Sequence, residues 1–510
     1  MRPKILGNTA AYTELHTNNI PTRLSWIAGI NVDQHPVGIR KTSIICTIGP
    51  KTNSPKVMAD LRKAGMNIAR LNFSHGSHEY HATAVQNVRD SFKLYDDRPV
   101  AIALDTKGPE IRTGNLKDEG GILIPEGHVF LITTDDKRMN DGDLDTIYMD
   151  YKNLPSAVKV NGKIFVDDGI LSLTVLECSG NTVKVKANNS HRLLNHKGVN
   201  LPDAEDLKFA VKHNLDMIFA SFIRKPEDVI EIRKILGEQG KDIKIISKIE
   251  STEGLKNFDD ILEVSDGIMV ARGDLGIEIP PEKVFLAQKM IIARCNIVGK
   301  PVICATQMLE SMTQNPRPTR AEVADVSNAI LDGSDCVMLS AETARGTYPV
   351  ETVQMMHKIV IEAESTISYV PLFEELRNLS FQSSGPTETI ACAAVNASLE
   401  DYIEAIIVLT TTGESARFVA KFRPAVPIIT VTRSEFVARQ IHLSRGCYPL
   451  YYEEKKISSW QDDVDARISY AVTQGKKMGL LKPNSHVVVI QGHQGGHGNT
   501  NTMKVIQVPE

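Results

Sequence analysis

The chain lacks the features that would place it in several specialised classes of protein. It contains no apolar run close to the roughly 18 residues that a membrane span needs. Its N-terminal stretch shows no apolar segment followed by a cleavage site, and its formal net charge of −4 carries no basic excess for nucleic acid. We therefore expect a cytoplasmic globular protein that binds neither nucleic acid nor a membrane.

Cysteine is sparse as well. The seven cysteines are scattered along the chain, and none forms a Cys-x-x-Cys pair. Most of them lie in apolar runs, which favours reduced thiols in the core of a cytosolic protein over disulfide bonds. No partner pattern for a catalytic thiol accompanies them, so thiol chemistry is not expected.

Short apolar runs, most of them followed by a helix-like stretch, recur along the first two thirds of the chain. The 510 residues exceed what one hydrophobic core accommodates, so several domains are expected. Eight repeats favour an α/β fold with a (β/α)8 TIM barrel over an open parallel sheet. The runs cover residues 43–47, 67–71, 100–105, 217–222, 243–249, 267–270, 302–305 and 336–339.

A long segment interrupts this pattern between the third and fourth runs. Its alternating strands and turns predict a small β-barrel domain inserted at the catalytic end of the barrel, where it would act as a lid. After residue 365 a second α/β pattern predicts a C-terminal open-sheet domain. The predicted division is an N-terminal arm at 1–40, the barrel at 41–108 and 203–365, the lid at 109–202 and the C-terminal domain at 366–510.

Charged residues follow two neighbouring strands of the predicted barrel. Lys248 and Glu250 are two residues apart and share one face of a strand, and Asp274 follows the next strand. Two carboxylates at neighbouring strand ends suit a hard cation such as Mg²⁺, and the ammonium would neutralise a phosphate or an enolate. Gly273 and Gly276 flank Asp274 at a helix start, where free N–H groups favour an anion. The alternative is a solvated ion pair beside a helix cap.

Polar side chains also follow the second and third runs. Four of them offer oxygen ligands of low total charge, which suit a monovalent cation better than Mg²⁺: Asn72, Ser74, Asp105 and Thr106. Arg70 and Arg112 would face inward and bind phosphate through two parallel hydrogen bonds. A helix cap at Ser74 and a turn at 108–109 are the structural alternative. In the last domain, hydroxyls and a glycine at 410–415 suit a phosphate, and a capped helix explains them equally well.

Several motifs resemble those of pyruvate kinases. The most specific is Ile-Lys-Ile-Ile-Ser-Lys-Ile-Glu-Ser-Thr-Glu-Gly-Leu at 243–255, and others lie at 70–76, 104–114, 269–276, 305–311 and 316–322. The likeness covers residues 42–508 and is greatest to the animal cytosolic enzymes. It implies phosphate transfer from phosphoenolpyruvate to ADP, giving pyruvate and ATP. It also implies a homotetramer whose interface includes the helix after residue 318.

The resemblance also implies roles for particular residues. Arg70 would hold the moving phosphoryl group, Lys248 would stabilise charge on that group and on the enolate, and Thr306 would assist enolate protonation. The substrate carboxylate would lie on the N–H groups of Gly273 and Asp274. Mg²⁺ would bind Glu250 and Asp274, and K⁺ would bind Asn72, Ser74, Asp105 and Thr106, with Glu110 marking K⁺ dependence. The nucleotide would contact Asn72, His75, Arg112 and Lys197, and Asp168 of the lid would approach on closure.

The last domain resembles the allosteric domain of the family. The sugar-bisphosphate pocket of regulated members is matched by Thr410, Thr412, Ser415, Trp460 and Arg467. Two departures weaken the match, because Thr411 stands where strongly activated forms have lysine and Glu414 replaces a basic residue. A free amino-acid pocket is matched by Asn67, Arg98 and His442, which could equally be packing residues.

One departure affects the predicted lid. After Pro202 the chain lacks a stretch that the family normally has, so the connection from the lid back to the barrel is short. A smaller departure is Ala341, where the family has glycine. The short connection supports a second hypothesis, a catalytically impaired relative that joins tetramers as a regulatory subunit. A third is a different metal-dependent barrel enzyme that makes or breaks a carbon–carbon bond next to the carboxylate of pyruvate.

Overall fold

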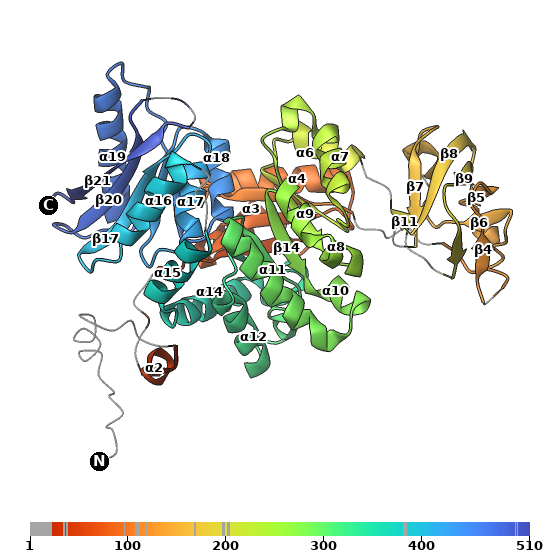
Figure 1. Ribbon diagram of the computed structural model, residues 1–510, viewed down its shortest axis with the longest axis horizontal. Helices are drawn as coiled ribbons and strands as arrows, with labels where there is room; N and C mark the ends of the chain where they lie inside the picture. Colours follow the sequence, from red (N-terminus) through yellow and green to blue (C-terminus); the bar gives the residue numbers. More distant parts are fainter. Residues whose placement is uncertain are drawn as a thin grey trace, which may run out of the picture.

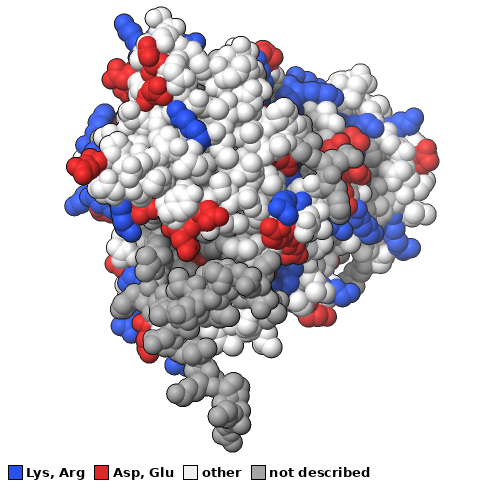
Figure 2. Space-filling view, turned by 60° about the vertical axis from the view of Figure 1, so that its left-hand side comes forward, with Lys and Arg blue, Asp and Glu red and all other residues white. Residues whose placement is uncertain are grey.

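The computed structural model describes residues 23–33, 36, 39–95, 97–107, 113–118, 120–152, 154–167, 170–195, 199–200, 204–380, 385–494, 496 and 498–510. A barrel occupies the middle of the molecule, with the C-terminal domain (blue) on one side and the inserted domain (yellow) on the other (Figure 1). On the face shown in Figure 2, acidic and basic side chains are interspersed. Within the described ranges, no helix is long and apolar enough to cross a membrane.

Eight parallel strands close into a barrel, which confirms the predicted fold class. The strands neighbour one another in the order β1-β16-β15-β14-β13-β12-β3-β2. They are β1 (Ser43–Ile48), β2 (Met66–Asn72), β3 (Ala101–Asp105), β12 (Met217–Ala220), β13 (Lys244–Ile249), β14 (Gly267–Ala271), β15 (Val302–Ala305) and β16 (Cys336–Leu339). The fourth strand stops two residues short of its predicted end, and Phe222, just beyond it, has a φ of +53° that does not continue a strand.

Helices cover the outside of the barrel. They are α3 (Pro55–Ala64), α4 (His78–Asp90), α6 (Ala204–Lys212), α7 (Pro226–Leu236), α8 (Thr252–Lys256), α9 (Phe258–Val264), α10 (Arg272–Glu278), α11 (Val284–Val298), α12 (Arg320–Leu331), α13 (Ala341–Ala344) and α14 (Pro349–Ser365). Every residue of β12, β14, β15 and β16 is buried. This explains why these strands are continuous apolar runs, since helices pack outside and side chains such as Phe219 and Met269 fill the interior.

The inserted domain is built mainly of antiparallel strands around its own core. One sheet has the order β11-β7-β8-β9-β5-β6, and β10 pairs with β4 beside it. Its elements are β4 (Ile122–Ile124), β5 (Val129–Thr133), β6 (Thr146–Tyr148), α5 (Leu154–Ala157), β7 (Lys163–Val166), β8 (Leu171–Ser179), β9 (Thr182–Ala187), β10 (His191–Leu193) and β11 (Val199–Asn200). Alternating burial along β9 reflects one face turned to this core. The connections at 108–112 and 201–203 lie outside the described residues, so the predicted domain boundaries remain predictions.

The C-terminal domain is an open sheet with helices on both faces. The order is β19-β18-β17-β20-β21, and only the last pairing is antiparallel. Its elements are α15 (Tyr369–Leu379), α16 (Pro386–Ala397), β17 (Ile403–Leu409), α17 (Glu414–Lys421), β18 (Ile428–Thr432), α18 (Glu435–Gln440), β19 (Cys447–Tyr451), α19 (Trp460–Lys477), β20 (His486–Gly492) and β21 (Thr500–Gln507). In the predicted N-terminal arm, α2 (Arg23–Ala28) is anchored because Trp26 Nε1 donates to the carbonyl of Thr366 (2.8 Å).

The C-terminal domain closes the amino end of the barrel strands. Gln440 Nε2 donates to the carbonyls of Asp216 and Asp242 (2.8 Å each), which precede β12 and β13. Arg439 Nε donates to Asp216 Oδ1 (2.7 Å), and Leu443 packs into the interior cluster of the barrel. The carboxyl ends of the strands therefore form the opposite end of the barrel, where the predicted site residues lie.

Candidate active site

The carboxyl ends of neighbouring strands bring the predicted residues together. Asn72 and Asp105 are register partners at the ends of β2 and β3, and Arg70 precedes them on β2. Lys248 lies near the end of β13, and Thr306 directly follows β15. Because all strands run parallel, these ends converge at one rim of the barrel.

A buried ion cluster forms the centre of this rim. Arg70 Nε lies 2.6 Å from Asp105 Oδ2, and Lys248 Nζ lies 3.0 Å from Asp105 Oδ1. Burial opposes the charge on Asp105, yet the two cations hold its pKa below the usual value. Burial likewise disfavours the ammonium of Lys248, but Asp105 and Glu250 raise its pKa. Lys248 therefore stays protonated, and it points a positive charge into the rim.

The surroundings of Glu250 suit a bound cation. It is fully buried, and its Oε2 accepts the N–H of Phe222. Its Oε1 lies 3.0 Å from Lys248 Nζ in an ion-pair contact, but forms no well-directed hydrogen bond. Burial and, to a smaller extent, the charge of Asp274 raise the pKa of Glu250 to about 7, against the opposing pull of Lys248. A divalent cation between the two carboxylates would relieve this destabilisation.

The oxygen-bearing groups predicted to hold a monovalent cation lie at the ends of β2 and β3. Ser74 N–H donates to Asn72 Oδ1 (3.2 Å), and the Thr106 hydroxyl accepts the N–H of Ser221 (3.0 Å). Asp105 is already paired with two cations, so only a weakly charged ion suits the remaining oxygens. Within the described part of the chain, no group of three or more His, Cys, Asp and Glu side chains could hold a metal.

Thr306 adopts a strained backbone conformation. Its φ is +69°, and that of Gln307 is +53°. A β-branched residue rarely has positive φ, and such strain costs on the order of 1–3 kcal/mol. The Thr306 hydroxyl accepts the N–H of Gly273 (2.8 Å) and donates to the carbonyl of Ala305 (2.6 Å). Strain of this kind at a strand end is typical of a functional loop.

Sequence reasoning missed two contributors to the site. The Ser221 hydroxyl accepts from Lys248 Nζ (2.9 Å) and donates to the carbonyl of Thr106 (2.8 Å), so it helps to orient the ammonium. Phe222 contributes only its backbone N–H, to Glu250. Ser221 could have been found by the same rule that found Lys248, since it is a polar residue at the end of a predicted strand. Phe222 carries no such signal.

Five further predicted residues lie away from the ion cluster or outside the described residues. His75 is exposed at the rim, where its carbonyl accepts from His81 Nε2 (2.8 Å). Four others lie outside the described residues: Glu110, Arg112, Asp168 and Lys197. The short connection after Pro202 does so too. The proposed contacts of these residues therefore remain predictions.

A pocket of about 410 Å³ in the C-terminal domain is lined by all five residues predicted for an effector: Thr410, Thr412, Ser415, Trp460 and Arg467. Thr411 and Glu414, the two departures, line it as well. The Thr410 hydroxyl accepts from Gly413 N–H and from the Ser415 hydroxyl (3.0 Å each), which shapes the turn into α17. The grouping is observed, whereas the ligand remains a prediction.

The predicted amino-acid pocket is occupied by contacts within the protein. His442 Nε2 lies 2.6 Å from the carbonyl of Pro99, and Arg98 stacks over Tyr448. Asn67 Nδ2 lies 3.5 Å from His442 Nδ1. Burial lowers the pKa of His442 to about 3, so the ring is neutral. These contacts fit the packing interpretation.

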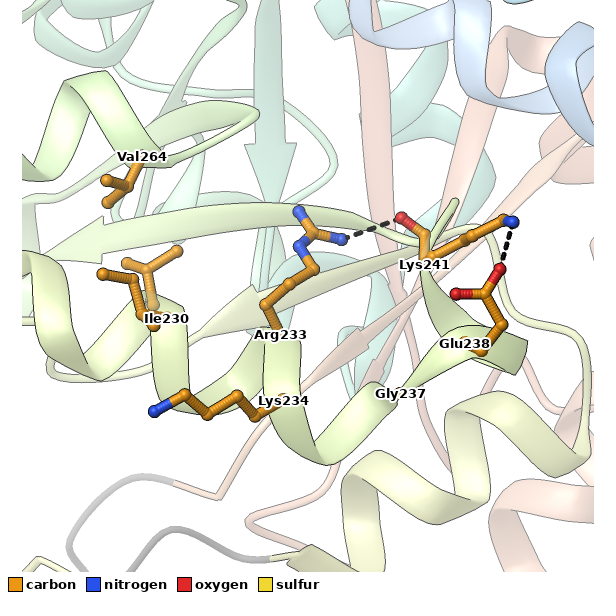
Figure 3. A pocket seen from close by; sticks show the side chains of 8 residues that line it. Ile230, Arg233, Lys234, Gly237, Glu238, Lys241 and Val264 are labelled. Atoms are coloured by element: carbon orange, nitrogen blue, oxygen red, sulfur yellow. Dashed lines mark hydrogen bonds and ion pairs between the residues drawn. The ribbon is translucent and has the colours of Figure 1, made fainter.

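A second hollow of about 400 Å³ lies on the flank of the barrel between α7 and α9 (Figure 3). Its lining combines apolar side chains with those of Arg233, Lys234 and Lys241, and Lys241 is paired with Glu238. It contains none of the predicted site residues.

Comparison with known proteins agrees with this geometry. The family model for the pyruvate kinase barrel domain matches residues 39–353, and that for the pyruvate kinase alpha/beta domain matches residues 388–506. A pyruvate kinase of Kluyveromyces lactis is 53% identical over 500 residues, covering 96% of this chain and 100% of that protein. Those of Candida albicans and Agaricus bisporus are 52% and 51% identical and cover 95% and 96% of this chain, and 99% and 97% of their own lengths. These relatives are fungal, so the likeness to animal enzymes remains a prediction. The chain belongs to the pyruvate kinase family.

Proposed function

We propose that this chain transfers the phosphoryl group of phosphoenolpyruvate to ADP, giving pyruvate and ATP. The observation that carries the proposal is the buried cluster of Arg70, Asp105 and Lys248 at the strand ends, in a chain that matches the family across both domains. Phosphoryl transfer needs positioning and charge neutralisation rather than a covalent nucleophile. The side chains of Arg70 and Lys248, both fixed by the buried carboxylate of Asp105, supply positioning and charge neutralisation.

We assign a distinct role to each member of the cluster. Arg70 presents a guanidinium to the moving phosphoryl group, while Asp105 fixes the orientation of that guanidinium. Lys248 stabilises negative charge first on the phosphoryl oxygens and then on the enolate oxygen that remains. The group passes from the enol oxygen to a terminal oxygen of ADP, and the enolate then takes a proton at its CH₂ carbon to become the methyl group of pyruvate.

Thr306 would assist this protonation. In the structure its hydroxyl accepts a hydrogen bond from the N–H of Gly273 (2.8 Å), which is one of the groups proposed to bind the substrate carboxylate. A carboxylate bound there would displace the hydroxyl, which would then be free to turn toward the substrate. The remaining N–H of the pair belongs to Asp274.

The residues present fit two cations. Glu250 and Asp274 would hold Mg²⁺, because Glu250 is a buried carboxylate whose Oε1 accepts no hydrogen bond and is held only by its ion pair with Lys248. Mg²⁺ would supply electrophilic stabilisation of phosphoryl and enolate oxygens. Asn72, Ser74, Asp105 and Thr106 would hold K⁺, because they offer neutral oxygens around a carboxylate that two cations already share.

The remaining proposals concern the nucleotide, the assembly and the cell. Asn72, His75, Arg112 and Lys197 would bind ADP, and the inserted domain would close over the site and exclude water. The chain would form a homotetramer in the cytoplasm. Full-length relatives are named pyruvate kinase, which favours an active enzyme over the regulatory-subunit hypothesis. The matches to both domain models argue against the carbon–carbon bond hypothesis.

A coupled assay of pyruvate formation tests the function. We expect turnover of phosphoenolpyruvate and ADP that requires Mg²⁺ and is strongly stimulated by K⁺ over Na⁺. A folded protein without turnover under these conditions would show that the proposed activity is wrong and would restore the regulatory-subunit hypothesis.

The pocket in the C-terminal domain is proposed to bind a sugar bisphosphate that activates the enzyme. Replacing Thr412, which lines it, with glutamate places a carboxylate beside the phosphate site, so activation by fructose 1,6-bisphosphate should be lost. Thr473→Glu adds the same charge on the exposed face of α19 and should retain activation. Equal activation of the two variants would show that the effector binds elsewhere.

A further inference from the structure

The strained loop that carries Thr306 is held from two sides. On one side, the buried carboxylate of Glu342 accepts the N–H of Leu309 (3.2 Å). On the other side, the guanidinium of Arg272 binds backbone carbonyls at the start of the loop. Between these two anchors lie the two residues with positive φ, Thr306 and Gln307. Because this conformation is intrinsically unfavourable, neighbouring groups must maintain it.

Arg272 contacts the loop at three points. Its Nε donates to the carbonyl of Ala305 (3.1 Å), and its Nη2 donates to the carbonyl of Thr306 (2.7 Å) and contacts Met308 Sδ (3.0 Å). Only 11% of its side chain is exposed. The guanidinium is a planar fork with fixed donor directions, so a change in its orientation would move the Thr306 carbonyl with it.

Asp325 fixes the orientation of this fork. Its Oδ1 accepts from Arg272 Nη1 (2.7 Å) and its Oδ2 from Arg272 Nη2 (2.8 Å), which is a two-bond pairing. Asp325 lies on α12, whose first turn is fixed by a capping box between Thr319 and Glu322. In the single chain its side chain is 38% exposed, on the helix that the family resemblance places in the subunit interface, so a substitution there leaves the core of this chain intact. In the contacts of the described residues, Asp325 reaches the Thr306 loop through Arg272.

We propose that Asp325 is a positioning residue for protonation of the enolate. By holding Arg272 it fixes the backbone of Thr306, so that the hydroxyl can reach the enolate once the substrate carboxylate has displaced it from Gly273; this inference rests on the role proposed for Thr306. In that step the Thr306 hydroxyl gives its proton to the CH₂ carbon and regains one from solvent water. The electron pair of the enolate C=C forms the new C–H bond, and the C2–O⁻ becomes the C=O of pyruvate. Asp325 therefore acts on the proton step, with little effect on substrate binding.

Asp325→Asn tests the proposal. The amide keeps the shape of the side chain, but its NH₂ group replaces one of the two acceptors and faces an N–H of the guanidinium. We expect kcat to fall about tenfold with KM for phosphoenolpyruvate within about twofold, since small misplacements near a reacting group have effects of this size or larger. The exchange of pyruvate methyl hydrogens with D₂O, with Mg²⁺, K⁺ and inorganic phosphate present, should fall by the same factor. Asp325→Glu retains both acceptors and should restore part of each rate.

Asp259→Asn is the matched control. It removes another aspartate–arginine pair, with Arg294 Nη1 (2.8 and 2.9 Å), which lies between α9 and α11. This control should keep kcat and the exchange rate. The proposal is wrong if Asp325→Asn behaves like the control, or if it raises KM while exchange is unchanged. Wild-type protein that forms no pyruvate from phosphoenolpyruvate would instead overturn the proposed function and this inference together.

Discussion

Replacing Lys248 with methionine is expected to lower kcat by about three orders of magnitude. The ammonium is fixed by Asp105, Glu250 and Ser221, so it faces the phosphoryl and enolate oxygens without reorganisation. Removing one such preorganised donor costs roughly 10²–10³ in kcat in other enzymes, and here the same group serves two charged oxygens in succession. Steady-state rates of pyruvate formation measure the loss.

The fold should survive this substitution. Asp105 keeps Arg70 as its partner, and Met has nearly the length of the lysine stem. Lys300→Met is a suitable control, because Lys300 Nζ also binds two oxygens, the carbonyls of Leu262 and Glu263 (2.7 Å each), outside the rim. The control should keep its kcat. If Lys248→Met kept more than about a tenth of the activity, electrostatic stabilisation by this ammonium would not explain catalysis.

The barrel could be predicted from sequence because its strands are buried on both faces. Such strands are short continuous apolar runs, and all eight were readable as such. The strand-end rule then predicted Arg70, Asp105 and Lys248, and the structure brings these three into one ion cluster. The residue types at these ends indicated a hard cation and a monovalent cation but left a solvated pair and a helix cap as alternatives, and the family resemblance then implied Mg²⁺ and K⁺.

Other features could not be predicted because they depend on distant parts of the chain or on backbone conformation. Arg439 and Asp216, which join the C-terminal domain to the barrel, are 223 residues apart. The positive φ of Thr306 runs against the preference of a β-branched residue, so sequence reasoning favours the opposite conformation. The pairing of Arg272 with Asp325 emerges only when α12 packs beside the end of β14.

Glu250→Gln is expected to separate the roles of this carboxylate in metal binding and in stability. The amide oxygen can still accept the N–H of Phe222, so the local backbone is retained, but the charge that would bind Mg²⁺ is lost. We expect the Mg²⁺ concentration for half-maximal activity to rise by at least about a hundredfold, the upper end of what changes beyond the direct ligands cost. Titration of activity with Mg²⁺ measures this change.

Without Mg²⁺, the Glu250→Gln substitution should not lower the free energy of unfolding, although it impairs metal binding. The pKa of Glu250 is raised to about 7 from an ordinary value of 4.5, so the native state binds the proton more tightly than the unfolded chain does. The carboxylate therefore lowers the free energy of unfolding progressively as pH rises from 4.5 to about 7, by about 3 kcal/mol in all. Above pH 7 without Mg²⁺, the neutral glutamine should make the variant at least as stable as the wild type.

Adding Mg²⁺ should raise the Tm of the wild type and leave that of the variant unchanged, because only the wild type offers two carboxylates to the ion. An equal Mg²⁺-induced rise in both proteins would place the metal away from Glu250.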